Sequence, residues 1–144
     1  MEMQRYLSKI SGPLLDRIDI HIEVTPVPFE KLSETRKAES SVEIRKRVTK
    51  ARDIQTKRFE NYNHIHYNAQ MSSKLIREYC DLDEVSLQLL KTAMERLNLS
   101  ARAYDRILKV SRTIADLENS ENVHSHHIAE AIQYRSLDRE GWLG

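Results

Sequence analysis

The hydrophobic pattern divides the chain into one short alternating segment and a long helical region. Within residues 18–24, Ile18, Ile20, Ile22 and Val24 alternate with polar residues. Such alternation places the apolar side chains on one face of a β-strand, so the sequence predicts a strand over 18–24. Little else in the chain has this pattern. A lone strand cannot satisfy its own backbone, which raises the question of the sheet to which it belongs.

Further along the chain, apolar residues recur at helical spacing. This pattern predicts helices over about 40–60, 73–80, 84–97, 100–118 and 126–135. Side chains that favour helix starts come at or just before these segments, namely Ser40, Ser72, Asp83, Ser100 and Ser125. The expected fold is therefore mainly α, a small helical bundle with one N-terminal strand.

A proline-containing segment separates the strand from the helices. Pro26 and Pro28 hold their surroundings extended and remove backbone donors, which is typical of a linker. The sequence predicts a first unit over 1–25, a linker over 26–39 and a helical domain over 40–144.

Composition and cysteine content narrow the class of protein. The 144 residues are 40% hydrophobic and 31% charged, with a net charge of +1, as in an ordinary globular domain. The single Cys80 excludes an internal disulfide and suits a reducing cytoplasm. Cys80 ends a short amphipathic helix, so we expect a small buried hydrophobe rather than a nucleophile. No run of ~18 apolar residues predicts a transmembrane helix.

Five of the histidines form two groups that could suggest a metal site. His64 and His66 are one pair, and His124, His126 and His127 are the other group. The spacing is not a zinc pattern, and neither a second cysteine nor a nearby group of carboxylates supports it. We therefore expect no metal site.

The helix predicted over 40–60 is rich in basic residues. Residues 31–60 contain ten Lys/Arg and five Asp/Glu, a local charge of 10 − 5 = +5. One interpretation is binding of a nucleic-acid backbone, and the other is a solvated helix face with interspersed acids.

Two arginines occupy positions that suit contact with an anion. Arg17 directly precedes the predicted strand, where a guanidinium can make bidentate contacts with phosphate oxygens. Its alternative role is a salt bridge to Asp16 or Asp19. Arg102 lies in the first turn of a helix, where a cation is disfavoured. Its alternative role is pairing with Asp105, three residues later.

Two stretches carry a resemblance to a known family. "SGPLLDRIDIHIEV" and "SARAYDRILKV…RTIADL" resemble the C-terminal part of magnesium chelatase-related AAA+ ATPases. The resemblance covers residues 4–140, and "SARAYDRIL" favours the ComM branch, also called the YifB group, over true chelatases. It implies that the strand over 18–24 is an edge strand of the AAA+ core and that the helices form the lid domain.

The resemblance also implies roles for the two arginines. The arginine of "LLDR", here Arg17, would be the arginine finger that reaches a nucleotide in the neighbouring subunit. The arginine of "SAR", here Arg102, would be sensor 2. The implied cofactors are ATP and Mg²⁺, and the implied partners are the N-terminal remainder, further copies in a hexameric ring, and DNA.

The motifs that bind the phosphates themselves do not occur in this sequence. There is no GxxxxGK[ST] loop and no Walker B strand ending in acidic residues. We therefore expect a piece of a longer ATPase, inactive by itself and without a cofactor of its own. Two alternatives stay open, a helical nucleic-acid-binding module and a subunit of a magnesium chelatase.

Overall fold

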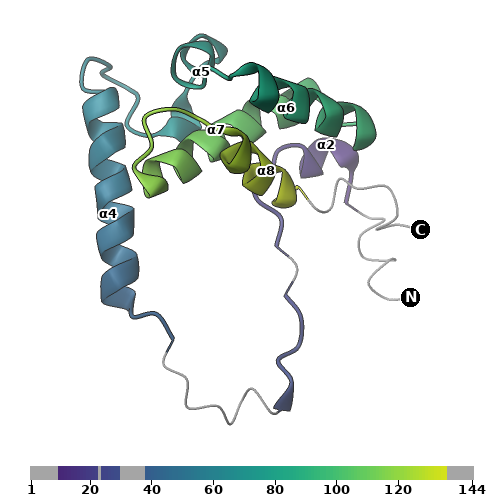
Figure 1. The fold of residues 1–144 in the computed structure, drawn as a ribbon, viewed down its shortest axis with the longest axis horizontal. Coiled ribbons are helices and arrows are strands. Elements are labelled where there is room, and N and C mark those ends of the chain that lie inside the picture. Colours follow the sequence, from purple (N-terminus) through teal and green to yellow (C-terminus); the bar gives the residue numbers. More distant parts are fainter. Residues whose placement is uncertain (1–9, 23, 30–37, 136–144) are drawn as a thin grey trace.

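The computed structural model describes residues 10–22, 24–29 and 38–135. The helices in this part are α2 (Gly12–Leu15), α4 (Ser41–Arg58), α5 (Ser73–Tyr79), α6 (Glu84–Arg96), α7 (Ala101–Glu118) and α8 (Ser125–Gln133), with a 3-10 turn, η1 (Asn68–Gln70), before α5 (Figure 1). This mainly helical architecture confirms the predicted fold class. None of the described helices is both long enough and apolar enough to cross a membrane.

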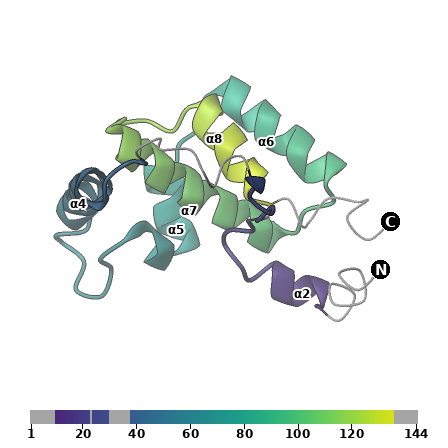
Figure 2. The same cartoon turned by 90° about the horizontal axis from the view of Figure 1, so that it is seen from below.

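Helix α7 is the centre of the bundle. It contacts α8, α4, η1 and α5, and Figure 2 shows it running through the middle, with α4 beside one end and α2 near the other. Its inward face buries Ala103, Ile107, Leu108 and Ala115. The surrounding core consists mainly of large apolar side chains from the other elements, namely Phe59, Met71, Leu75, Ile76, Leu90 and Ile128. The apolar spacing of α7 predicts Ala103, Ile107, Val110, Ile114 and Leu117 as its inward face. Ala103 and Ile107 are buried as predicted, whereas Val110 and Ile114 are half-buried and Leu117 is 39% exposed.

Helix starts and stops are explained by single polar residues. Ser40, Ser72, Asp83 and Ser100 each accept a hydrogen bond from the backbone N–H three residues later. The left-handed stop predicted at Asn98 is present, with φ of 48°.

The predicted cap at Ser125 is wrong. Helix α8 begins at Ser125 itself, and His124 occupies the N-cap position. The reason is a reciprocal bond in which the backbone N–H of His124 donates to Nδ1 of His127 at 2.9 Å.

Only the C-terminal half of α4 packs on the bundle. Ala51 and Gln55 are buried, and Phe59, which follows the helix, is also in the core. Ile44 and Val48, on the same stripe, are 41% and 46% exposed. The N-terminal half of α4 therefore stands clear of the other helices, as Figure 1 shows.

The segment predicted as a strand is not part of a sheet in the described residues. Residues 18–22 and 24 are irregular, and no strand is present among residues 10–22, 24–29 and 38–135 to pair with them. Their apolar face is open to solvent, with Ile22 72% and Val24 87% exposed. The segment instead folds back on the helices, because the N–H of His21 donates to the carbonyl oxygen of Tyr134 at 2.7 Å.

Candidate functional site

Arg17 and Arg102, the two arginines predicted to contact an anion, are both exposed. Arg17 lies in the turn that follows α2, and Arg102 is the second residue of α7. Within the described residues, neither guanidinium has a hydrogen bond or an ion pair. The N-terminus of α7 carries a partial positive charge, so the helix dipole does not stabilise the positive charge of Arg102.

The carboxylates that could have neutralised these arginines are engaged elsewhere. Asp19 pairs with Arg106 rather than with Arg17. Asp105 accepts a hydrogen bond from the hydroxyl of Ser73 at 3.2 Å. Asp16 lies 3.9 Å from Nη2 of Arg135. The intramolecular salt bridges considered for Arg17 and Arg102 are therefore absent from the described part of the molecule.

Arg106 holds the turn containing Arg17 against α7. Its Nε donates to the carbonyl oxygen of Asp16 at 2.8 Å, and its Nη1 contacts the carboxylate of Asp19. Arg106 lies one helical turn after Arg102, so the two side chains share a face of α7. Arg17 directly follows Asp16, and this contact therefore brings the turn that carries Arg17 to the N-terminal part of α7.

A second arginine, Arg135, anchors the same segment from a position just after α8. Arg135 is 1% exposed. Its Nη1 donates to the carbonyl oxygen of Ile18, and its Nη2 lies 3.5 Å from that of Leu15. Buried guanidinium groups need such acceptors, because an unsatisfied buried charge is costly. Sequence reasoning missed both Arg106 and Arg135, since each donates to a backbone carbonyl, which no sequence pattern marks.

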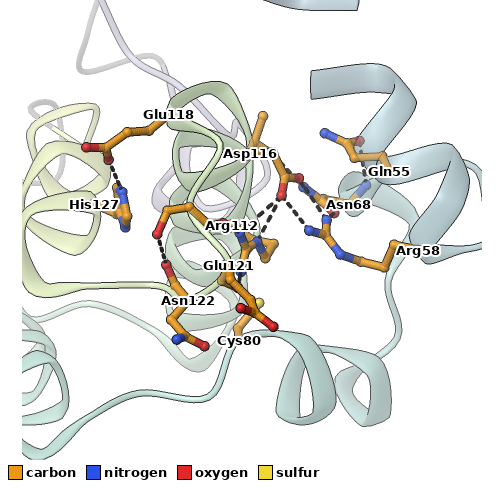
Figure 3. A network of polar contacts seen from close by, with 12 residues as sticks. Gln55, Arg58, Asn68, Cys80, Arg112, Asp116, Glu118, Glu121, Asn122 and His127 are labelled. Atoms are coloured by element: carbon orange, nitrogen blue, oxygen red, sulfur yellow. Dashed lines mark hydrogen bonds and ion pairs between the residues drawn. The ribbon is translucent and has the colours of Figure 1, made fainter. Parts of the chain in front are cut away.

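A buried polar network fixes α4 to α7 (Figure 3). Asp116, in α7, accepts from Nη1 of Arg58 at 2.7 Å and from Nη2 at 2.5 Å. Asn68 donates to the same carboxylate at 2.8 Å, and Nε of Arg112 at 3.2 Å. Burial lowers the pKa of Arg112, while the charge of Asp116 opposes that shift. One carboxylate thus orients two cations and sets where α4 leaves the bundle.

Several basic residues of α4 have intramolecular partners, which reduces the basic surface predicted there. Lys46 pairs with Glu43 at 2.8 Å, Arg47 with Glu39 at 2.5 Å, and Arg52 lies over the ring of Tyr67. Arg58 belongs to the buried network. The basic residues of α4 without a partner in the described part are Arg45, Lys50 and Lys57.

Glu118 joins two of the histidines, which the spacing did not predict. Its Oε2 lies 2.8 Å from Nε2 of His126 and also contacts Nε2 of His127. The sequence spacing does not reveal this contact, because Glu118 lies at the end of α7 while both histidines lie in α8. Hydrogen bonds from His126 and His127 lower the pKa of Glu118, and burial lowers the pKa of His127.

These contacts are those of a helix cap rather than of a metal site. Nδ1 of His127 accepts the N–H of His124, so a neutral ring carries its proton on Nε2 and donates it to Glu118. A metal ion would need a lone pair on Nε2 of His127, and in this tautomer that nitrogen carries the proton instead. His64 and His66 are exposed on the loop after α4 and belong to no such cluster among the described residues.

Cys80 is a packing residue, as its position predicts. It is 4% exposed, and burial raises the pKa of its thiol to about 12. A thiol held in the protonated form at neutral pH is a poor nucleophile.

Comparison with known proteins adds a family assignment to this geometry. Residues 38–135 match the model of the magnesium chelatase subunit ChlI C-terminal domain, and residues 1–32 match that of magnesium chelatase subunit ChlI. The chain is 42% identical to competence protein ComM of Haemophilus influenzae over 139 residues, covering 96% of this chain and 26% of that protein. It is 40% identical to the uncharacterized protein YifB of Escherichia coli over 136 residues, covering 94% of this chain and 26% of that protein. The chain thus spans about a quarter of the length of these relatives.

Proposed function

Because the chain belongs to the family of magnesium chelatase ChlI C-terminal domains, we propose that it is the C-terminal part of a ComM-like AAA+ ATPase, in which Arg17 and Arg102 contact ATP. The observation that carries this proposal is that both guanidinium groups are exposed and unpaired among the described residues, while the nearby acids Asp19 and Asp105 have other partners.

The chemistry of the two side chains fits the phosphates of a nucleotide. Guanidinium groups bind phosphate oxygens in a bidentate manner and stay charged at all relevant pH values. Phosphoryl transfer depends mainly on positioning and on compensation of negative charge. Arg17 acts as the arginine finger on ATP in the neighbouring subunit, and Arg102 acts as sensor 2 from the start of α7, where the helix N-terminus also favours an anion.

The remaining parts of the ATP site belong to the rest of the parent protein. This sequence has no GxxxxGK[ST] loop, and the acids close to the two arginines are already engaged. Mg²⁺ and the phosphate-cradling loop are therefore assigned to the N-terminal remainder. The parent is a hexameric ATPase that drives DNA branch migration, and the piece described by this sequence does not hydrolyse ATP.

The domain division follows from the same proposal. Residues 1–25 are the end of the AAA+ core, 26–39 are the linker, and 40–144 are the helical lid. One family match ends at residue 32, and the other begins at residue 38. Both of these limits lie within the proposed linker, which supports this division.

The experiment is ATP hydrolysis by the intact parent protein. Arg17→Ala should lower the rate by about 10³–10⁵, the range measured for arginine fingers elsewhere. Arg102→Ala should also lower it. Arg96→Ala is the matched control, because Arg96 is an exposed arginine at the end of α6. Rates that match the control in both variants would disprove the assignment.

A second function, direct DNA binding by α4, is favoured by its exposed basic residues. Arg45, Lys50 and Lys57 lack partners among the described residues, and the N-terminal half of the helix is open to solvent. Binding through these groups should weaken steeply with salt, by about 0.9 in the log–log slope for each phosphate contact. Arg45→Ala with Lys50→Ala should reduce that slope, whereas Lys91→Ala, on α6, should leave it unchanged. Absence of binding at low salt would remove this function.

A further inference from the structure

Arg17 lies at the corner of a tight turn. The N–H of Ile18 donates to the carbonyl oxygen of Leu15 at 3.0 Å, and this bond closes a β-turn over residues 15–18. Arg17 is the third residue of that turn and is exposed to solvent. The region that its guanidinium can reach therefore depends on where the backbone of this turn is held.

Arg135 holds both ends of the turn. Its Nη1 donates to the carbonyl oxygen of Ile18, and its Nη2 lies 3.5 Å from the carbonyl oxygen of Leu15. The carboxylate of Asp16, inside the turn, lies 3.9 Å from the same Nη2. A guanidinium presents its donors in a rigid planar fork, so this one side chain fixes the first and the last residue of the turn.

Apolar packing does little to hold the turn in place. Ile18 and Ile20 are 41% and 45% exposed, and Leu15 is only half-buried. Arg135, in contrast, has the largest volume of the fully buried side chains among the described residues. A buried guanidinium is costly unless its donors have acceptors, and here the acceptors include carbonyl oxygens on both sides of Arg17. Such an arrangement suits a side chain that fixes a backbone geometry.

We propose that Arg135 is a positioning residue for Arg17, and that its effect reaches the ATP site of the neighbouring subunit through the turn 15–18. This inference rests on the proposed function, in which Arg17 is the arginine finger. An arginine finger compensates charge only when it is accurately placed, and a displacement of about 1 Å in an active site can lower the rate by about 10². Arg135 itself does not touch the nucleotide.

The test measures ATP hydrolysis by the intact parent protein carrying Arg135→Lys. Lysine keeps the charge but replaces the planar fork by a single ammonium group, so it cannot hold both ends of the turn in the same geometry. We expect kcat to fall by about 10- to 100-fold. The KM for ATP should stay near the wild-type value, because the affected nucleotide is bound by the other subunit. Arg96→Lys, at an exposed position in the last turn of α6, is the matched control and should keep the wild-type kcat.

A mixed ring shows in which subunit Arg135 acts. The Arg135→Lys form is combined with a second form that lacks the lysine of its phosphate-binding loop but keeps Arg17 and Arg135. If Arg135 acts through Arg17, the second form supplies a correctly placed finger, and hydrolysis by the mixture should rise severalfold above that of either form. Absence of recovery would show that Arg135→Lys damages the subunit that holds the ATP, and would overturn the proposal. A wild-type kcat in Arg135→Lys would overturn it as well.

Arg17→Ala, measured in the same two ways, separates this inference from the proposed function. If Arg17→Ala keeps the wild-type rate, the proposed function fails and this inference fails with it. If Arg17→Ala is impaired and recovers in the mixed ring while Arg135→Lys does not recover, only the role of Arg135 is wrong.

A second variant, Arg135→Gln, removes the buried charge and guards against misfolding of the lysine variant. It should show the same loss of kcat and the same recovery in the mixed ring. Loss of the helical circular dichroism in both variants would make Arg135 a residue of general stability, and the proposal would then be wrong.

Discussion

Arg106 donates from its Nε to the carbonyl oxygen of Asp16 at 2.8 Å, across 90 residues of sequence. This bond joins the turn that carries Arg17 to the helix that carries Arg102. Arg17, one of the two arginines proposed to contact ATP, therefore depends on another arginine that need not touch the nucleotide. Arg106 is a positioning residue for Arg17.

Loss of Arg106 should release the N-terminal segment without unfolding the helices. Arg106→Ala removes the bond to Asp16 and the ion pair with Asp19, both partly exposed, so we expect a loss of about 1 kcal/mol in local stability. Hydrogen exchange at the backbone N–H of His21 should accelerate about fivefold. Exchange at Ile107 and Leu108, in the core of α7, should stay as in the wild type.

The control for this prediction is Arg106→Lys. A lysine keeps a positive charge near Asp19 but offers a point charge instead of a planar fork, so its effect should be intermediate. Unchanged exchange at His21 in the alanine variant would mean that Arg135 and Tyr134 hold the segment alone, and Arg106 would lose its positioning role.

Asp116 should be the most sensitive polar residue of the bundle. Asp116→Ala leaves Arg58 and Arg112 without their shared carboxylate, and removal of one partner from a buried ion pair costs about 3–5 kcal/mol. Urea denaturation of the chain measures this loss. Asp81→Ala, at an exposed position before α6, should change the free energy of unfolding by less than about 0.5 kcal/mol. Equal effects of the two substitutions would contradict the role given to the network.

The stability of the chain should decline as the pH falls below about 6.5, the pKa of an unperturbed histidine. Burial lowers the pKa of His127 in the folded chain. Between the folded and unfolded pKa values the unfolded chain binds more protons, so protonation favours unfolding. The lowered pKa of Glu118 acts in the same direction, but in a separate window below its ordinary value of 4.5.

Thermal unfolding between pH 7.5 and 5.5 tests this prediction. His127→Gln cannot titrate and should flatten the decline, whereas His64→Gln, at an exposed loop position, should preserve it. If the decline in stability persists in His127→Gln and vanishes in His64→Gln, His127 is not its source and the prediction is contradicted.

The helices and their caps were predictable because their causes are local. Apolar residues at three- and four-residue spacing mark α5 to α8, and Ser72, Asp83 and Ser100 stand directly before the helices they cap. The start of α8 was placed wrongly because a histidine pair, His124 and His127, replaced the serine cap. Histidine is not among the residues that favour N-cap positions, so the sequence pattern did not indicate it.

Contacts between distant residues could not be predicted in the same way. The bonds of Arg106 and Arg135 end on backbone carbonyl oxygens of Asp16 and Ile18, which every residue type possesses. The alternation over 18–24 favours a strand, but pairing needs a neighbouring strand, and the described part has none. Arg17 and Arg102 were found through their motifs, and the structure adds that the nearby acids are engaged by other groups.

The most direct test of the central claim mixes two inactive forms of the intact parent protein. One form carries Arg17→Ala, and the other lacks the lysine of its phosphate-binding loop. In a mixed ring, an intact ATP site in the first form can meet an intact Arg17 from the second. The account predicts that ATP hydrolysis by the mixture rises well above that of either form alone. A mixture no more active than its two components would contradict the claim that Arg17 acts on the nucleotide of a neighbouring subunit.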